Sequence, residues 1–335
     1  MEEIVQIYLQ SFPTLALFMV IAAMLYTLSK GADILVDEAV GLSLQLGISK
    51  AIIGATIVSL GTTLPEASVS VLAALRGNPD LALGNAIGSI IVDTGLIIGL
   101  AVFFGRLPVN PHIVKRQGKI QVWAGVLLAF VSLPFLGGDG RISQWMGWLF
   151  LALLVIYIYT SMKWSKNPEF QEAATFDEEG KISIFLRFLK LFAGILLVIV
   201  SSRILIPTVE ITAVRIGVPQ SIIAATLVAF GTSLPELVTA ITAARKGHGE
   251  LAVGNIVGAD ILNVLFVVGS AAAVTKGGLS VPVTFYKLQI PAMLLILFVF
   301  RFFSKSMKQE EITKAEGLVL LCLYFVYLGM NYAFI

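Results

Sequence analysis

Long runs of apolar residues constrain the fold of this 335-residue chain more than any other feature. A helix needs about 20 predominantly apolar residues to cross the hydrocarbon core of a bilayer, and inside that core the backbone must satisfy its own hydrogen bonds. Windows of this kind lie near residues 13–37, 46–76, 81–104, 118–137, 145–162, 183–206, 217–245, 251–274, 284–303 and 315–334. The sequence therefore predicts an all-α polytopic membrane protein with ten transmembrane helices.

The composition agrees with a chain that lies mostly in lipid, and it excludes several classes of function. Hydrophobic types make up 57% of the residues and charged types only 13%, whereas an ordinary soluble domain has about 25% charged residues. The formal net charge of +2 provides no strong field for binding nucleic acid. The single Cys322 excludes an intramolecular disulfide and a thiolate metal site. His112 and His248 lie in charged connecting segments, so a metal site built from histidines is not expected. No enzymatic cofactor is expected.

The distribution of basic residues predicts the orientation in the membrane. With ten spans the connections alternate between two faces, and most of the 23 Lys and Arg residues then fall on one face. The positive-inside rule assigns that face to the cytoplasm. We therefore expect an integral protein of the cell membrane (plasma or inner), with both termini outside and the lipid bilayer as a partner.

An internal repeat divides the chain into two similar halves. A shift of 170 residues aligns 54–100 with 224–270 without a gap, and Gly, Pro, Glu and Asn recur at matching places. The predicted halves are 1–162 and 183–335, joined by a short cytoplasmic loop over 163–182. Five spans in each half reverse the second copy in the membrane. This predicts two inverted five-helix repeats, as in many secondary transporters, and we expect a monomer.

Glu66 and Glu236 occupy matching positions deep inside apolar runs. A carboxylate at the bilayer centre costs about 2.5–3.5 kcal/mol on insertion scales. Because no Lys or Arg is expected at comparable depth, an inorganic cation is the favoured partner. The alternative is a neutral glutamate that is hydrogen-bonded for packing.

A proline directly precedes each of these glutamates, as Pro65 and Pro235. Proline lacks the N–H that would bond the carbonyl four residues back. We therefore expect helices 2 and 7 to break there, which frees carbonyl oxygens as ligands. Each glutamate then lies in the first turn of a new half-helix, where the helix dipole favours a negative charge.

Helical rise places Asp93 level with Glu66, and Asn263 level with Glu236, because similar lengths of helix lie on either side of an intervening turn. We therefore expect the side chains at these four positions to meet near the midplane. Such a cluster of carboxylates and an amide offers only oxygen ligands, which suit Ca²⁺ or Na⁺ and not a soft metal. Asp260 points about 60° away from Asn263 around the helix, and no role is assigned to it.

Small and amide residues near these positions have a structural interpretation. The small-xxx-small pairs Gly84/Gly88, Gly95/Gly99 and Gly254/Gly258 predict close approach of helices. Asn85 and Asn255 are expected to hydrogen-bond the broken backbone more than to bind an ion.

The segments GTTLPE and GTSLPE, each followed by Gly-Asn-x-x-Gly, resemble the two alpha-repeats of the calcium/cation antiporter superfamily, most closely its sodium/calcium exchanger branch. The resemblance implies alternating access, with Ca²⁺ exchanged for Na⁺ at overlapping midplane sites. It implies that Glu66 and Glu236 ligate Ca²⁺. The residues that it implies as lining Na⁺ sites are Thr62, Thr63, Thr232, Ser233 and Ser89, with backbone oxygens of Ser59 and Ala229.

Two departures from the archaeal pattern of this superfamily leave the coupling ion open. Asp93 stands where that pattern has Asn, and Asn263 stands where it has Asp, so the charge moves between the halves. Ala259 replaces the serine expected as the partner of Ser89, which removes one hydroxyl. A Ca²⁺/H⁺ antiporter and a K⁺-dependent Na⁺/Ca²⁺ exchanger with the same carboxylates are therefore alternatives.

Other classes of membrane protein fit less well. An intramembrane protease would need a Ser/His pair or two catalytic aspartates, and neither is expected in the core. A passive channel would conduct without a counter-ion, so a flux that saturates and requires a counter-ion on the far side would exclude it.

Overall fold

The computed structural model describes residues 2–109, 111–134, 140–165, 183–217, 231–305 and 311–333, and most of these residues are helical. The α-helices are α1 (Glu2–Ser11), α2 (Thr14–Leu46), α3 (Lys50–Ile53), α4 (Ser59–Thr62), α5 (Leu64–Leu75), α6 (Pro79–Ile91), α7 (Ile98–Phe104), α8 (Pro111–Val131), α10 (Gln144–Ser165), α11 (Ile184–Arg215), α14 (Leu234–Arg245), α15 (Gly249–Leu262), α16 (Gly269–Val274), α17 (Ile290–Lys305) and α18 (Lys314–Ala333). The π-helical turns are η1 (Gly54–Val58), η2 (Val92–Ile97), η5 (Asn263–Val268) and η6 (Phe285–Gln289).

The described helices account for most of the predicted spans. Seven are long and apolar enough to cross a membrane, and there are eight if the bent pair Lys50–Thr62 and Leu64–Leu75 is one span. These match eight of the ten predicted windows. The window at 118–137 overlaps α8, which is not one of the seven, and both this window and the window at 217–245 lie partly outside the described residues. The chain is an integral membrane protein, and the count of ten stays a prediction.

Helix boundaries recur at the interval of the sequence repeat. Helices α5 and α14 each have 12 residues and begin 170 positions apart, at Leu64 and Leu234. Helices α10 and α18 also begin 170 positions apart, at Gln144 and Lys314. The repeat therefore extends from residue identities to the places where helices start.

Two short antiparallel ladders add strand structure that the all-α prediction omits. Strand β1 (Leu107–Pro108) pairs with β4 (Glu311–Ile312), and β2 (Arg141–Ile142) pairs with β3 (Leu279–Ser280). Each ladder joins a connection in one half of the chain to a connection in the other half. The two halves are therefore joined by backbone hydrogen bonds at two places, one in each ladder.

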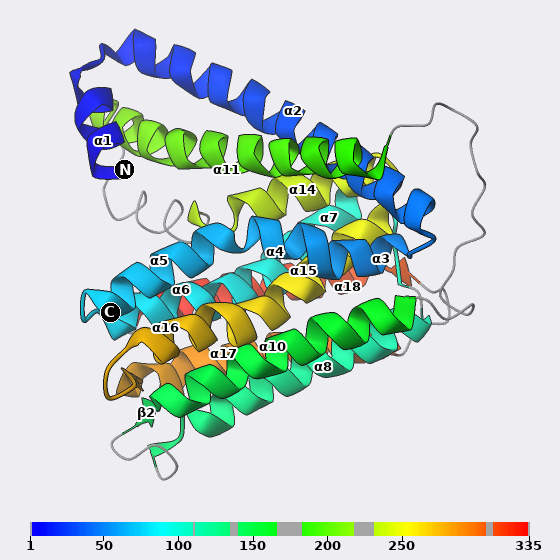
Figure 1. The fold of residues 1–335 in the computed structure, drawn as a ribbon. Coiled ribbons are helices and arrows are strands. Elements are labelled where there is room, and N and C mark those ends of the chain that lie inside the picture. Colours follow the sequence, from blue (N-terminus) through cyan, green and yellow to red (C-terminus); the bar gives the residue numbers. More distant parts are fainter. Residues whose placement is uncertain are drawn as a thin grey trace.

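Helices α2 and α11 run alongside each other at one side of the molecule, while α8 and α10 lie at the opposite side (Figure 1). Glycines allow the close approach of α2 and α11. A Cβ at Gly194 would lie 2.8 Å from the backbone nitrogen of Leu35, and one at Gly31 would lie 2.9 Å from Cβ of Leu197. The two longest helices thus pack backbone against backbone.

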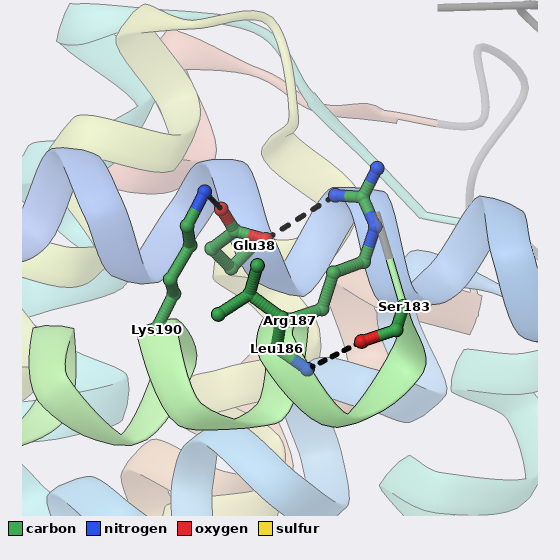
Figure 2. A network of polar contacts seen from close by, with 5 residues as sticks. All are labelled: Glu38, Ser183, Leu186, Arg187 and Lys190. Carbon is green, nitrogen blue, oxygen red and sulfur yellow. Dashed lines mark hydrogen bonds and ion pairs between the residues drawn. The ribbon is translucent and has the colours of Figure 1, made fainter. Parts of the chain in front are cut away.

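An ion-pair network fastens one end of this helix pair (Figure 2). Glu38 on α2 accepts a hydrogen bond from Arg187 at 3.2 Å and pairs with Lys190 at 3.6 Å, both on α11. Ser183 caps α11 by accepting the N–H of Leu186 at 3.2 Å. Glu38 is 9% exposed, so its charge depends on these two partners.

Helix α15 forms the centre of the bundle, because its glycines admit the backbone of the neighbouring broken helix. A Cβ at Gly254 would lie 2.2 Å from the carbonyl oxygen of Ala51, and one at Gly258 would lie 2.5 Å from Cα of Ala55. This packing brings the polar face of α15 against the segment that leads to Glu66.

The predicted close approach is confirmed at Gly254 and Gly258, and also at Gly99, where a Cβ would lie 3.0 Å from the carbonyl oxygen of Gly317. It is wrong for the Gly84/Gly88 pair, since a Cβ at Gly88 would meet no described atom within 4 Å.

Candidate functional site

The predicted break in the second helix is present. Helix α4 ends at Thr62, α5 begins at Leu64, and the two segments are bent by 44°. Pro65 and Glu66 lie in the first turn of α5. Because the first turn leaves N–H groups unbonded and carries the positive end of the helix dipole, it favours a carboxylate at this place.

The second repeat has the same arrangement where the structure describes it. Helix α14 begins at Leu234, with Pro235 and Glu236 in its first turn. The segment immediately before residue 231 lies outside the described residues. The predicted break in helix 7 is therefore described on one side only.

Asp93 and Asn263 both lie in π-helical turns. Asp93 is the second residue of η2, and Asn263 is the first residue of η5. A π-turn interrupts the regular i to i−4 hydrogen bonding, and such turns are frequent at functional sites. The sequence repeat predicted that these two side chains correspond, but it gave no signal for the π-turns.

Three carboxylates are brought together in the interior. Glu66, Glu236 and Asp93 are each 1% exposed. Each lies within electrostatic range of another: Glu66 of Asp93, Asp93 of Glu236, and Glu236 of Glu66. No oxygen of these three carboxylates has a hydrogen-bond partner in the part of the chain that the structure describes. Buried carboxylates in this arrangement must be neutralised, either by a compensating cation or by protons.

Threonines and asparagines make reciprocal hydrogen bonds between the two halves. Thr232 Oγ1 donates to Asn85 Oδ1 at 3.0 Å, and Thr62 Oγ1 donates to Asn255 Oδ1 at 3.5 Å. Asn85 Nδ2 donates to the backbone oxygen of Glu66 at 3.1 Å, as expected for an asparagine that supports the broken helix. These hydrogen bonds between the halves were not predicted, because the sequence does not show which side chains of one half contact which side chains of the other.

This pattern leaves the threonine oxygens available as acceptors. A hydroxyl has one hydrogen and two lone pairs. The hydrogen of Thr232 goes to Asn85 Oδ1, and that of Thr62 goes to Asn255 Oδ1 or to the carbonyl of Ser59 at 3.4 Å. Thr232 Oγ1 lies near Glu66, and Thr62 Oγ1 lies near Glu236, without satisfying the carboxylates by hydrogen bonds. A cation between a threonine and a glutamate would therefore meet oxygen lone pairs from both halves.

The other predicted site residues have mixed surroundings. Ser89 lies 3.4 Å from Thr232 Oγ1, Ser233 lies near Asp93, and Ser59 donates to the carbonyl of Thr56 at 3.3 Å. Thr63 Oγ1 and Asn263 Oδ1 are buried, and neither has a hydrogen-bond partner within the described ranges. Ala229 lies outside the described residues.

The expectation that no basic side chain reaches this depth is wrong. Arg203 on α11 donates a hydrogen bond to the carbonyl oxygen of Pro65 at 3.3 Å, and its charge acts on Glu66. A long, flexible arginine side chain carries its charge well away from its backbone position. The sequence placed Arg203 at a membrane face because its backbone lies near the end of a predicted span. That assignment did not account for the reach of its side chain, so this contact was not predicted.

The acidic groups alone do not make a metal centre. In the described ranges, no group of three or more His, Cys, Asp or Glu side chains is arranged to hold a metal ion. A cation at this place would also need hydroxyl, amide and backbone oxygens. Buried hydroxyl and amide oxygens of this kind are present near the break before Glu66 and at the start of α14.

Comparison with known proteins identifies the family. A family profile described as sodium/calcium exchanger protein matches residues 16–163 and 187–333, which is most of both halves. The chain belongs to the sodium/calcium exchanger protein family. It is 32% identical to the inner membrane protein YrbG of Escherichia coli (strain K12) over 309 residues, covering 90% of this chain and 92% of that protein.

Two further comparisons extend over almost the whole chain. The sodium/calcium exchanger MaX1 of Methanosarcina acetivorans is 27% identical, with 93% of this chain and 97% of that protein covered. A solved structure of the sodium-calcium exchanger NCX_Mj is similar with a TM-score of 0.77 and 25% identity, covering 95% of this chain and 99% of that one. The fold of this chain is thus that of a membrane exchanger, which supports a role as a transporter and not as an enzyme.

Proposed function

We propose that this protein is a secondary active antiporter that exchanges Ca²⁺ for Na⁺ by alternating access. In this proposal ten helices form two inverted repeats, 1–162 and 183–335, with the cation site at the midplane between them. The observation that carries the proposal is the group of three buried carboxylates, drawn from both halves, whose oxygens find no hydrogen-bond donor among the described residues. Family membership and the likeness to exchangers support it.

The proposed Ca²⁺ ligands are Glu66 and Glu236, with Asp93 and Asn263 beside them. Ca²⁺ takes 6–8 oxygen ligands, more than the carboxylate oxygens of the two glutamates provide. The hydroxyls of Thr62, Thr63, Thr232, Ser233 and Ser89, and the backbone oxygens of Ser59 and Ala229, complete the proposed set for Ca²⁺ and Na⁺.

Charge balance gives a physical reason for exchange. Ionised Glu66, Glu236 and Asp93 carry three negative charges in an apolar interior, and Arg203 offsets part of this charge. One Ca²⁺, or two to three Na⁺, brings the site close to neutrality, which lowers the cost of moving it through a closed, water-free state. An empty site stays charged and should resist switching. Such a site exchanges cations and does not leak them.

The experiment is Ca²⁺ flux into proteoliposomes that contain the purified full-length chain. An outward Na⁺ gradient should drive saturable ⁴⁵Ca²⁺ uptake, and Glu66→Gln should abolish it while the exposed Asp80→Asn leaves it intact. Uptake driven by a pH gradient without Na⁺ would replace the proposal with Ca²⁺/H⁺ antiport, the alternative that the missing hydroxyl at Ala259 favours. Uptake that also requires K⁺ would select a K⁺-dependent exchanger.

A further inference from the structure

A second buried polar cluster lies beside the three carboxylates and is not part of the site described above. Asp260 on α15 is 2% exposed. Its Oδ2 accepts hydrogen bonds from Thr94 Oγ1 on η2 and from Gln121 Nε2 on α8, the latter at 2.6 Å. Gln121 Nε2 also donates to Thr94 Oγ1 at 3.2 Å. Three separate helical segments thus converge on one carboxylate.

The donors satisfy only one side of this carboxylate. Asp260 Oδ1 has no hydrogen-bond partner within the described ranges, and the same holds for Gln121 Oε1. Gln121 Nε2 contacts both Thr94 and Asp260, and the amide oxygen is bonded to the same carbon as this nitrogen, so Gln121 Oε1 belongs to the same cluster. Two oxygen acceptors are therefore buried at one place without a donor, and each would cost about 1–3 kcal/mol if nothing bound it.

No basic side chain of the described residues forms an ion pair with Asp260. Its charge instead acts on Asp93, whose own oxygens also lack partners in the described structure. Two carboxylates in electrostatic contact inside an apolar protein need a positive charge close to both. Asp260 Oδ1, which has no donor within the described ranges, is therefore available as a ligand for a cation.

The repeat shows that the fold does not require this cluster. The position equivalent to Asp260 is Ile90, and the position equivalent to Thr94 is Val264, and both are fully buried apolar side chains. The same place in the other half is thus filled by hydrocarbon. A carboxylate is present only in the half where Ala259 lacks the hydroxyl that its counterpart Ser89 carries.

We propose that Asp260 Oδ1 and Gln121 Oε1, together with Asp93, form an additional binding subsite for one monovalent alkali cation. Asp93 also lies beside the proposed Ca²⁺ site, so Asp260 adds one negative charge to the cluster, which a singly charged ion would balance. The oxygens named here are also fewer than the 6–8 that Ca²⁺ takes. The inference rests on the proposed function, because it assigns one co-transported cation of that function to a specific place.

The test measures equilibrium binding of ²²Na⁺ to the purified full-length protein in detergent, with ⁸⁶Rb⁺ as a probe for K⁺-like ions in a parallel arm. Asp260→Asn should bind one fewer monovalent ion per protein than the wild type. Gln121→Leu, which keeps the charge, should weaken that ion by about tenfold, and Asp80→Asn should match the wild type. An unchanged number of bound monovalent ions in Asp260→Asn, which is expected if Asp260 simply holds a proton, would overturn the proposal, and so would an unchanged affinity in Gln121→Leu.

A transport readout separates this proposal from the proposed function. Isotopic Ca²⁺/Ca²⁺ exchange needs only the glutamate site, so it should persist within about twofold in Asp260→Asn, while the charge moved per Na⁺/Ca²⁺ cycle changes by one. Loss of Ca²⁺/Ca²⁺ exchange in folded Asp260→Asn would contradict a separate subsite. Absence of Na⁺-driven Ca²⁺ flux in the wild type would instead refute the proposed function, and the ²²Na⁺ and ⁸⁶Rb⁺ binding would still decide the subsite.

Discussion

Arg203 donates a hydrogen bond to the carbonyl oxygen of Pro65 at 3.3 Å, which places a guanidinium one residue away from Glu66. The contact joins α11, in the second half of the chain, to the helix break in the first half. It supplies a fixed positive charge beside a site that we propose for mobile cations. Arg203 should therefore compete electrostatically with bound Ca²⁺.

Replacement of this arginine is expected to tighten Ca²⁺ binding. Arg203→Gln retains a hydrogen-bond donor for the Pro65 carbonyl but removes the positive charge that acts on Glu66. An interaction on the order of 1 kcal/mol for a partly exposed charge corresponds to about fivefold in Kd. Isothermal titration with Ca²⁺ measures the change, and Arg76→Gln in an exposed turn is the control. Weaker Ca²⁺ binding in Arg203→Gln would contradict this electrostatic role.

The crossed threonine bonds predict a selective effect of removing one hydroxyl. Thr232→Val keeps the side-chain shape, removes the proposed ligand oxygen near Glu66 and leaves Asn85 Oδ1 without its donor. We expect the Na⁺ concentration for half-maximal Ca²⁺ uptake to rise about tenfold, as for the loss of about 1–1.5 kcal/mol. Thr232→Ser, which restores a hydroxyl, should return it to near the wild-type value. Equal behaviour of the Val and Ser variants would argue against a role for the oxygen.

The Glu38 network predicts a loss of stability away from the cation site. Glu38→Gln leaves Arg187 and Lys190 facing a neutral group at a mostly buried place. Allowing for partial exposure of these side chains, the expected cost is about 1–2 kcal/mol, or a decrease of about 2–6 °C in Tm in detergent. Asp37→Asn, at the more exposed pair with Lys246, should change Tm by less. A larger effect at Asp37 would reverse the ranking that burial predicts.

The glycine contacts of α15 predict a packing failure from a single methyl group. Gly258→Ala would place a Cβ 2.5 Å from the backbone of Ala55, which cannot move without displacing the segment that leads to Glu66. We expect a large loss of monodisperse protein in size-exclusion chromatography. Gly329→Ala on α18 is the matched control, since a Cβ there meets no described atom within 4 Å. Normal folding of Gly258→Ala would show that the two helices are less tightly packed than described.

Much of this arrangement follows from local sequence patterns. The apolar runs predicted the helices, Pro65 predicted the break before Glu66, and the repeat predicted that Asp93 and Asn263 occupy equivalent helices. Each of these depends on chain geometry within a short segment or on a comparison of two segments. The binding roles of these side chains stay predictions.

Other features depend on how distant segments meet, which a single sequence does not specify. Arg203 was assigned by the depth of its backbone, although its side chain reaches the Pro65 carbonyl. Asp260 had no interpretable role because its donors, Thr94 and Gln121, come from two other helical segments. No residue pattern in the sequence distinguishes the π-turns from ordinary α-helix.

The most direct measurement is the position of a bound divalent ion in crystals of the full-length protein soaked with Ca²⁺ or Sr²⁺. We predict one strong anomalous peak between Glu66 and Glu236, at about 2.3–2.6 Å from carboxylate oxygens of both for Ca²⁺, and its loss in Glu236→Gln. A peak that contacts only one half of the chain, or an empty space between the two glutamates at saturating Ca²⁺, would contradict a cation site shared by the two repeats.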